Sequence, residues 1–282
     1  MTERLADIGA RIDGIRQLGA VVNAMRGMAA ARAQQARSQL IAVDSYAATI
    51  ALVIGRALTF VPSTRPAAAR KSARPALVLF CAEQGFAGAF SERALDAVGA
   101  DLVTSELFLI GTRGAAVAAE RGVVADWKSA MPSHSLAIPK LADRIADALY
   151  TRIATGEIDR LDAVFSQWRT GHGAQVERRR LFPLDMTAFS RPTDANPPLL
   201  NLAPEALLSE LTADYMHAQL CNAALHAFAG ENEARMAAMA SAHNQIERQL
   251  STLRATQRLV RQEEITAEIV ELAAGETASR SA

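Results

Sequence analysis

The sequence predicts an α/β protein in which two long terminal helices form an antiparallel coiled coil and the middle forms a small parallel sheet with helices. Three observations predict this fold class: the proline positions, a seven-residue apolar repeat near each end, and alternating strand and helix patterns between them. All ten prolines lie from Pro62 to Pro204, so long helices can form only outside that region. We therefore divide the chain into an N-terminal helix over residues 1–60, an α/β domain over 75–200 and a C-terminal helix over 205–273.

The N-terminal segment repeats apolar residues with the spacing of a coiled coil. One series is apolar throughout, and its companion is weakened only by Gly19 and Arg26. Together they alternate spacings of three and four, the pattern of a left-handed supercoil. The series are Ile8, Ile15, Val22, Ala29, Ala36, Val43, Ile50 and Leu5, Ile12, Gly19, Arg26, Ala33, Leu40, Ala47, Ile54. Such a helix would be roughly 85 Å long, so most of it needs a partner outside a small domain.

The C-terminal segment supplies that partner, with a more polar seam. Its series are Asn232, Met239, Ile246, Leu253, Val260 and Met236, His243, Leu250, Gln257, Glu264. Ile265, Ile269 and Leu272 extend the apolar face toward the C-terminus, and we expect Gly275 to end the helix. Because a globular domain separates the two segments, the chain can enter and leave that domain at neighbouring points and the helices can run antiparallel.

The middle of the chain alternates strand and helix patterns. Short apolar runs predict strands at residues 76–81, 107–110 and 162–168, with a weaker fourth at 179–183. Helical stretches lie between them near 91–99, 114–121 and 140–155. This alternation predicts a small parallel sheet with right-handed crossovers. Residues 190–201, rich in Pro, Asn and Asp, read as the connector to the C-terminal helix.

The composition limits the classes of function. Lys plus Arg and Asp plus Glu number 30 each, so the formal net charge is zero and no global field favours nucleic acid. Cys81 and Cys221 lack a CxxC context, which favours reduced, buried thiols. The first residues do not resemble a signal peptide, and no stretch of about 18 consecutive apolar residues predicts a membrane span. We expect a soluble, cytoplasmic protein.

The sequence predicts no catalytic, cofactor or metal site. The turn Glu83–Gly88 follows a strand, but it lacks the three glycines of a dinucleotide fingerprint and there is no phosphate-binding loop with Lys and Ser or Thr. We interpret it as a tight strand-to-helix turn. The five histidines have no metal-binding spacing, and no nucleophile elbow is present.

One charge pattern does indicate a binding surface. No acidic residue lies from Gly14 to Val43, and the C-terminal helix is rich in arginine before an acidic stretch. The arginines are Arg16, Arg26, Arg32, Arg37, Arg235, Arg248, Arg254, Arg258 and Arg261, and the acids are Glu263, Glu264, Glu268 and Glu271. A solvated face and nucleic-acid binding are alternatives. Without interleaved aromatic residues, acidic loops of a protein partner fit better.

Four stretches of the chain resemble the γ subunit of F-type ATP synthases: Val22–Arg32, Glu83–Gly88, Glu233–Met239 and Arg261–Ile269. The resemblance extends over nearly the whole chain. It implies a central-stalk subunit without an active site of its own, whose terminal helices form a shaft inside a ring of α and β subunits. It also implies a Rossmann-like middle domain that binds no nucleotide.

The resemblance further implies partners and contact residues. The partners are the α and β subunits, the ε subunit and the membrane rotor c-ring, on the cytoplasmic face of a bacterial cell membrane. The resemblance implies that Met25 lies near an acidic loop of β and that Arg261 and Gln262 contact another. With the basic flanks included, the expected β contacts are Met25, Arg26, Arg32, Arg254, Arg261 and Gln262. A coiled-coil structural adaptor with a non-catalytic domain is the alternative function.

Some residues depart from the family pattern. Arg26 stands where an acid is usual, Gly27 where a methionine is usual, and Ala87 where a cysteine is usual. His243-Asn244-Gln245 also replaces the usual triplet. These departures indicate a divergent branch, and we hypothesise an alternative, sodium-coupled rotary ATPase. Sodium dependence of ATPase activity in the purified complex tests that hypothesis.

Overall fold

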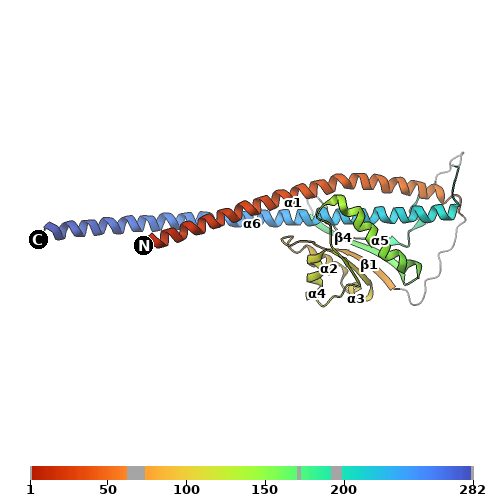
Figure 1. Ribbon diagram of the computed structural model, residues 1–282, viewed down its shortest axis with the longest axis horizontal. Helices are drawn as coiled ribbons and strands as arrows, with labels where there is room; N and C mark the ends of the chain where they lie inside the picture. The colour runs from red at the N-terminus through yellow and green to blue at the C-terminus, as the bar shows by residue number, and fades with distance from the viewer. Residues whose placement is uncertain (1, 62–73, 170–172, 192–198, 281–282) are drawn as a thin grey trace. The chain divides into compact units, whose positions relative to one another are not determined.

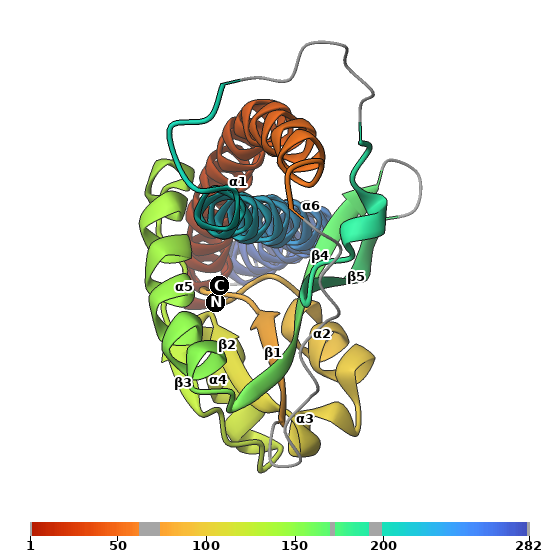
Figure 2. The ribbon, with the colours of Figure 1, turned by 90° about the vertical axis from the view of Figure 1, so that its right-hand side faces the viewer.

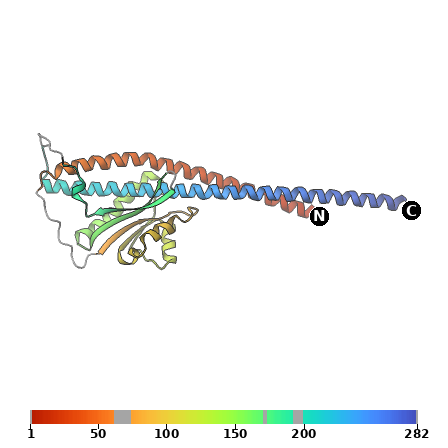
Figure 3. The same cartoon turned by 180° about the vertical axis from the view of Figure 1, so that it is seen from behind.

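The computed structural model describes residues 2–61, 74–169, 173–191 and 199–280. Two long helices bracket the chain, α1 over Thr2–Ala57 and α6 over Pro204–Arg280. The chain divides into two compact units. Unit 1 contains residues 1–28 and 236–282, and unit 2 contains Ala29–Arg235. Each unit holds a part of both helices, which lie side by side in views from opposite sides (Figures 1 and 3).

The sheet of unit 2 has five strands in the order β3-β2-β1-β4-β5. Their bounds are β1 Arg74–Phe80, β2 Glu106–Ile110, β3 Trp127–Ser129, β4 Ile158–Arg169 and β5 Gly173–Phe182. The pairs β1–β2 and β1–β4 are parallel, as the sequence predicts, and β2 also pairs parallel with β3, a strand that the sequence did not predict. The prediction is wrong for the fourth predicted strand, because β5 pairs antiparallel with β4. Only three residues separate these two strands, and so short a connection suits an antiparallel pair.

Helices cover both faces of this sheet (Figure 2). Their bounds are α2 Phe90–Val98, α3 Asp101–Thr104, α4 Thr112–Glu120 and α5 Ile138–Ala154, with 3-10 turns at Ser135–Ala137 and Met186–Ala188. One face packs Leu77 and Leu79 of β1 against α2 and α4. The other packs Val78 and Phe80 against α5, α6 and α1. Every second residue of β1 thus faces the long helices, which makes the coil part of the core of unit 2.

The heptad prediction is confirmed in both units, because every predicted seam position of α1 and α6 is buried or half-buried. In unit 1, Ile8, Ile12 and Val22 pack with residues of α6 that include Ile246 and Leu250. In unit 2, Asn222 donates to Asp44 at 2.6 Å, and Arg37 forms an ion pair with Glu233. Between these two pairs, the residue number on α1 falls from 44 to 37 while the residue number on α6 rises from 222 to 233, so the helices are antiparallel.

The C-terminal end of α6 differs from the prediction. The helix continues past Gly275 to Arg280, so the predicted stop is wrong. In unit 1, α6 also runs beyond the N-terminal end of α1 (Figure 1). Ile265, Ile269 and Leu272 are consequently 51%, 60% and 69% exposed instead of extending the packed seam.

The sequence analysis expected no segment apolar enough to span a membrane, but α1 meets that criterion. Among the residues that the structure describes, one segment, Arg4–Ala57, is long and apolar enough to cross a membrane by length and composition alone. Its seam side chains pack against α6 within each unit. A single helix of this kind is weak evidence for a membrane span.

Candidate functional site

The expected contact residues of α1 are only partly available to a partner. In unit 1, Met25 packs against the apolar seam cluster and is half-buried. Arg26 is half-buried too, and its Nη2 donates to Asn23 Oδ1 at 3.0 Å on the same helix. In unit 2, Arg32 lines a small pocket with Glu83 and Glu231. Arg32 therefore lies beside the sheet domain of its own chain.

The expected contact residues of α6 are solvent-exposed. Arg254, Arg261 and Gln262 all lie on exposed positions of unit 1. Within the part of the chain that the structure describes, neither arginine forms an ion pair, so both are candidates for binding an acidic partner. The helix surface changes sign just beyond them, where Glu263 and Glu268 are also exposed.

Unit 1 does not bring all of these residues together. A Cβ atom added at Gly19 would meet Ile246 Cγ2 at 3.3 Å, which fixes the register of the two helices. One heptad further along α1, Arg26 is level with Met239. Arg254 lies fifteen positions beyond Met239, which is roughly 22 Å at 1.5 Å per residue. The expected contacts that belong to unit 1 therefore form two separate patches, one near Met25 and one near Arg254–Gln262.

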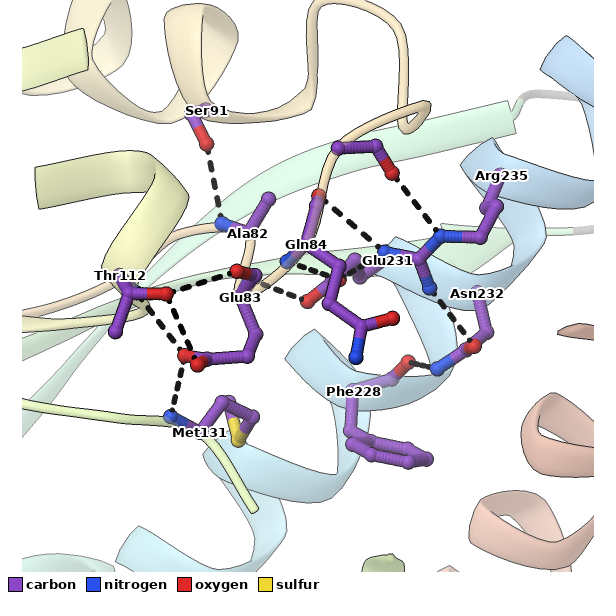
Figure 4. A network of polar contacts seen from close by, with 11 residues as sticks. Ala82, Glu83, Gln84, Ser91, Thr112, Met131, Phe228, Glu231, Asn232 and Arg235 are labelled. Carbon is purple, nitrogen blue, oxygen red and sulfur yellow. Dashed lines mark hydrogen bonds and ion pairs between the residues drawn. The ribbon is translucent and has the colours of Figure 1, made fainter. Parts of the chain in front are cut away.

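Unit 2 contains a polar network at the carboxyl ends of its parallel strands (Figure 4). After β1, the backbone N–H groups of Glu83 and Gln84 donate to the carboxylate of Glu231 at 2.9 and 3.2 Å. Glu231 comes from α6, far along the chain. Its carboxylate accepts two successive backbone N–H groups, an arrangement in which turns commonly bind anions.

A second carboxylate connects the same turn to the neighbouring strands. Glu83 Oε2 accepts from the backbone N–H of Thr112 at 3.0 Å and from that of Met131 at 2.8 Å. Thr112 begins α4 after β2, and Met131 follows β3. The Thr112 hydroxyl also donates to Glu83 Oε1 at 3.0 Å. Glu83, which follows β1, is thus hydrogen-bonded to the chain segments that follow β2 and β3.

Arg235 completes the network. It pairs with Glu231, and both side chains are buried, at 6% and 3% exposure respectively. Its guanidinium also donates to the carbonyls of Gly85 at 3.2 Å and Gln84 at 3.3 Å, and to Asn232 Oδ1 at 3.1 Å. Every charge in this buried cluster therefore has a partner, as burial of ions requires. Burial, with the Glu231 carboxylate nearby, raises the pKa of the Cys81 thiol to about 12.

A third group of contacts joins β5 to both long helices within unit 2. Arg179 Nη1 donates to Asn222 Oδ1 at 2.8 Å, and Asn222 in turn donates to Asp44 of α1. The Arg179 guanidinium lies 5.0 Å from the ring centre of Phe165, whose ring also stacks with His226 at 5.7 Å. Burial and the charge of Arg179 lower the pKa of His226.

The sequence patterns did not predict this network, and they placed one of its members differently. Arg235 was expected in the exposed basic zone, but the structure buries that side chain in an ion pair. Three acidic residues are buried as well, namely Glu231, Glu233 and Asp162. A Glu and an Arg at i,i+4 within an alanine-rich, apolar stretch are the signal that could have indicated a buried pair.

Comparisons with known proteins agree with one another. The ATP synthase family model matches residues 4–278. The chain is 26% identical to the ATP synthase gamma chain of Bdellovibrio bacteriovorus over 96% of this chain and 97% of that protein. It is 28% identical to the ATP synthase gamma chain of Parafrankia sp. over 100% and 99%.

Solved structures share the fold. The rotor of Euglena gracilis mitochondrial ATP synthase has a TM-score of 0.67 at 14% identity, covering 94% of this chain and 100% of that chain. The central stalk of the Tetrahymena thermophila mitochondrial enzyme has a TM-score of 0.53 at 15% identity, covering 79% and 99%.

Proposed function

Because this chain belongs to the γ-subunit family of ATP synthases, we propose that the exposed surface of its coil in unit 1 contacts the β subunits of the catalytic ring. The chain is the central-stalk subunit of a rotary F-type ATP synthase and couples ion flow through the membrane sector to ATP synthesis or hydrolysis. Its partners are the α and β subunits, the ε subunit and the c-ring. The observation that carries the assignment is the family match over residues 4–278.

The proposed contact surface consists of two patches. The first contains Met25 and Arg26, and the second contains Arg254, Arg261 and Gln262. Arg32, which lies in unit 2, is a separate proposed contact. Exposure and charge support the second patch most directly, since its side chains are solvent-exposed and two of them are basic. Basic side chains on a partner-facing surface favour acidic loops and guide their orientation.

Charge reversal in the second patch tests this surface. We expect the Arg254→Glu/Arg261→Glu protein to assemble with its partners but to synthesise ATP more slowly in reconstituted vesicles. Arg113→Glu is the matched control, because Arg113 is exposed on α4 of unit 2 and is not part of the coil. If the double variant synthesises ATP as fast as the control, these arginines are not coupling contacts.

Truncation tests the tip of α6. Removing the chain from Arg258 onward deletes the part of α6 that includes Arg261, Gln262 and the exposed apolar residues beyond them. We expect coupling between ATP hydrolysis and ion transport to weaken before assembly is lost, because most of the seam remains. Full coupling in the truncated complex contradicts the proposal.

We also propose a location for the subunit. It is peripheral to the membrane within its complex, and the bacterial relatives support the cytoplasmic face of the cell membrane. Protease access to the chain in inside-out vesicles, but not in right-side-out vesicles, is the expected result. The opposite pattern contradicts this location.

A further inference from the structure

We propose that the turn after β1 is an anion-binding nest whose built-in occupant is the Glu231 carboxylate, and that this contact fastens the sheet domain to α6. Open α/β sheets bind their ligands at the carboxyl ends of the parallel strands. In this chain, that edge holds two carboxylates of the protein itself, Glu231 and Glu83. The edge that serves as a ligand site in other proteins serves here as an attachment point.

The geometry of the turn supports the nest. Three successive backbone N–H groups after β1 point to acceptors: that of Ala82 donates to Ser91 Oγ at 3.1 Å, and those of Glu83 and Gln84 donate to the two carboxylate oxygens of Glu231. Two successive N–H groups aimed at one anion form a concave, partly positive site. Phe86, with a φ of 61°, sits in the left-handed region within the same turn.

The surroundings of Glu231 explain why it can occupy this site permanently. Arg235, one helical turn further along α6, pairs with the same carboxylate and contacts the carbonyls of Gln84 and Gly85. The turn therefore presents both N–H and C=O groups to one Glu–Arg pair. Such a charge-assisted arrangement is stronger than neutral hydrogen bonds and satisfies both buried ions.

Helix α6 also packs closely against the sheet at the residue that precedes Glu231. Gly230 precedes Glu231, and a Cβ atom added to it would lie 2.9 Å from the carbonyl oxygen of Ser166 in β4. A residue with a side chain would push α6 away from the sheet and lengthen the Glu231 hydrogen bonds. Gly230 therefore allows α6 to pack closely against the sheet, and Glu231 accepts the hydrogen bonds that join α6 to the turn after β1.

The fastening can be tested in the full-length chain by amide hydrogen exchange at Glu83 and Gln84. In Glu231→Ala we expect protection of these two amides to fall on the order of tenfold, because each loses a charged acceptor. Glu231→Asp keeps the charge beside Arg235 but shortens its reach, so it should also lower protection at both amides while preserving the fold. Glu233→Ala is the matched control, since Glu233 is equally buried two residues away but pairs with Arg37 of α1.

An added anion tests the nest directly. Millimolar inorganic phosphate should restore part of the protection at Glu83 and Gln84 in Glu231→Ala, while sodium chloride of equal ionic strength should not. Unchanged protection of the two amides in Glu231→Asp overturns the fastening, and an equal loss in Glu233→Ala does the same. Failure of phosphate to restore protection in a folded Glu231→Ala chain overturns the nest.

Discussion

Gly19 offers a direct test of how the two helices meet in unit 1. It is a glycine at a seam position, where the sequence pattern alone shows only a weakness in the repeat. In the structure, a Cβ atom at this position would lie 3.3 Å from Ile246 Cγ2. The Gly19→Ala substitution therefore adds one methyl group to the interface between α1 and α6, and its effect depends on Ile246.

The expected magnitudes follow from two opposing effects. Alanine stabilises a helix interior by about 1 kcal/mol relative to glycine. The added methyl group would lie closer to Ile246 than an ordinary van der Waals contact allows. Overpacking of this kind costs about 1 kcal/mol or somewhat more. We therefore expect Gly19→Ala to change the free energy of unfolding by about zero. Gly14→Ala should give the full gain of about 1 kcal/mol, because nothing lies within 4 Å of its added Cβ.

A double-mutant cycle with Ile246→Ala isolates the contact. Ile246→Ala should itself cost about 2–5 kcal/mol, because Ile246 is buried in the seam cluster. In that background Gly19→Ala no longer meets a methyl group and should recover its gain of about 1 kcal/mol. The two substitutions should therefore couple by about 1 kcal/mol, beyond the ~0.5 kcal/mol seen for independent sites.

Urea unfolding of the full-length chain, followed by far-UV circular dichroism, measures this cycle. All three positions lie in unit 1, so the same part of the chain reports each change. The reasoning is refuted if Gly19→Ala stabilises as much as Gly14→Ala in the otherwise unchanged protein and its effect adds to that of Ile246→Ala. That result would mean that Gly19 does not face Ile246 and that the register is wrong.

Three further predictions concern unit 2. Gly230→Ala should destabilise the chain by about 1–2 kcal/mol in urea unfolding despite its helix propensity, because the new methyl group meets the Ser166 backbone; a gain in stability contradicts the close approach. The folded pKa of His226 lies below its ordinary 6.5, with Arg179, Asp44 and Glu177 facing it. Its stabilising contribution is therefore present above about pH 6.5 and is lost as the pH falls through the folded pKa, and His226→Gln should flatten the pH dependence of unfolding there. Arg37→Leu should cost about 1–3 kcal/mol by leaving Glu233 buried without its partner, and Arg37→Leu/Glu233→Leu should recover that loss in thermal unfolding. A double variant as unstable as Arg37→Leu shows that the ion pair is not the cause.

The coil could be predicted from the sequence because its signal is long and periodic. The two apolar series of α1 continue over seven or more repeats, and a repeat of that length is typical of coiled coils and uncommon in globular helices. The three main strands were also predictable, because buried parallel strands form short, continuous apolar runs such as 76–81. These are features in which local residue type and final burial agree.

The parts that could not be predicted depend on contacts that no local pattern encodes. The apolar pattern of β5 is broken by Glu177, Arg178, Arg179 and Arg180, and its direction follows only from the short connection after β4. β3 has three residues, too few for a periodic signal. At Gly275 the expected stop failed because glycine lowers helix stability by only about 1 kcal/mol, which its neighbours in α6 can offset.

The two candidate sites also differ in how far the sequence predicts them. Exposure of Arg254, Arg261 and Gln262 agrees with the sequence pattern, because a charged or polar residue outside the seam faces solvent by default. The network around Glu231 was not predictable, because its members come from the turn after β1, the start of α4, the chain after β3 and α6. Residues so far apart in sequence are brought together only by the finished sheet and its packing against α6.

Four polar residues near the end of unit 2 show why α6 carries polar side chains in its core. Glu231 and Arg235 bond to the turn after β1, whereas Glu233 between them pairs with Arg37 on α1. Asn232 donates to the carbonyl of Phe228 at 2.8 Å and accepts from Arg235. An alanine-rich seam alone would tolerate sliding by one heptad, since each step presents similar small side chains. Polar partners at fixed positions along the helices make such a shift in register unfavourable, because every shift leaves buried charges unpaired. We therefore attribute to this cluster the choice of one register for α6 against both α1 and the sheet.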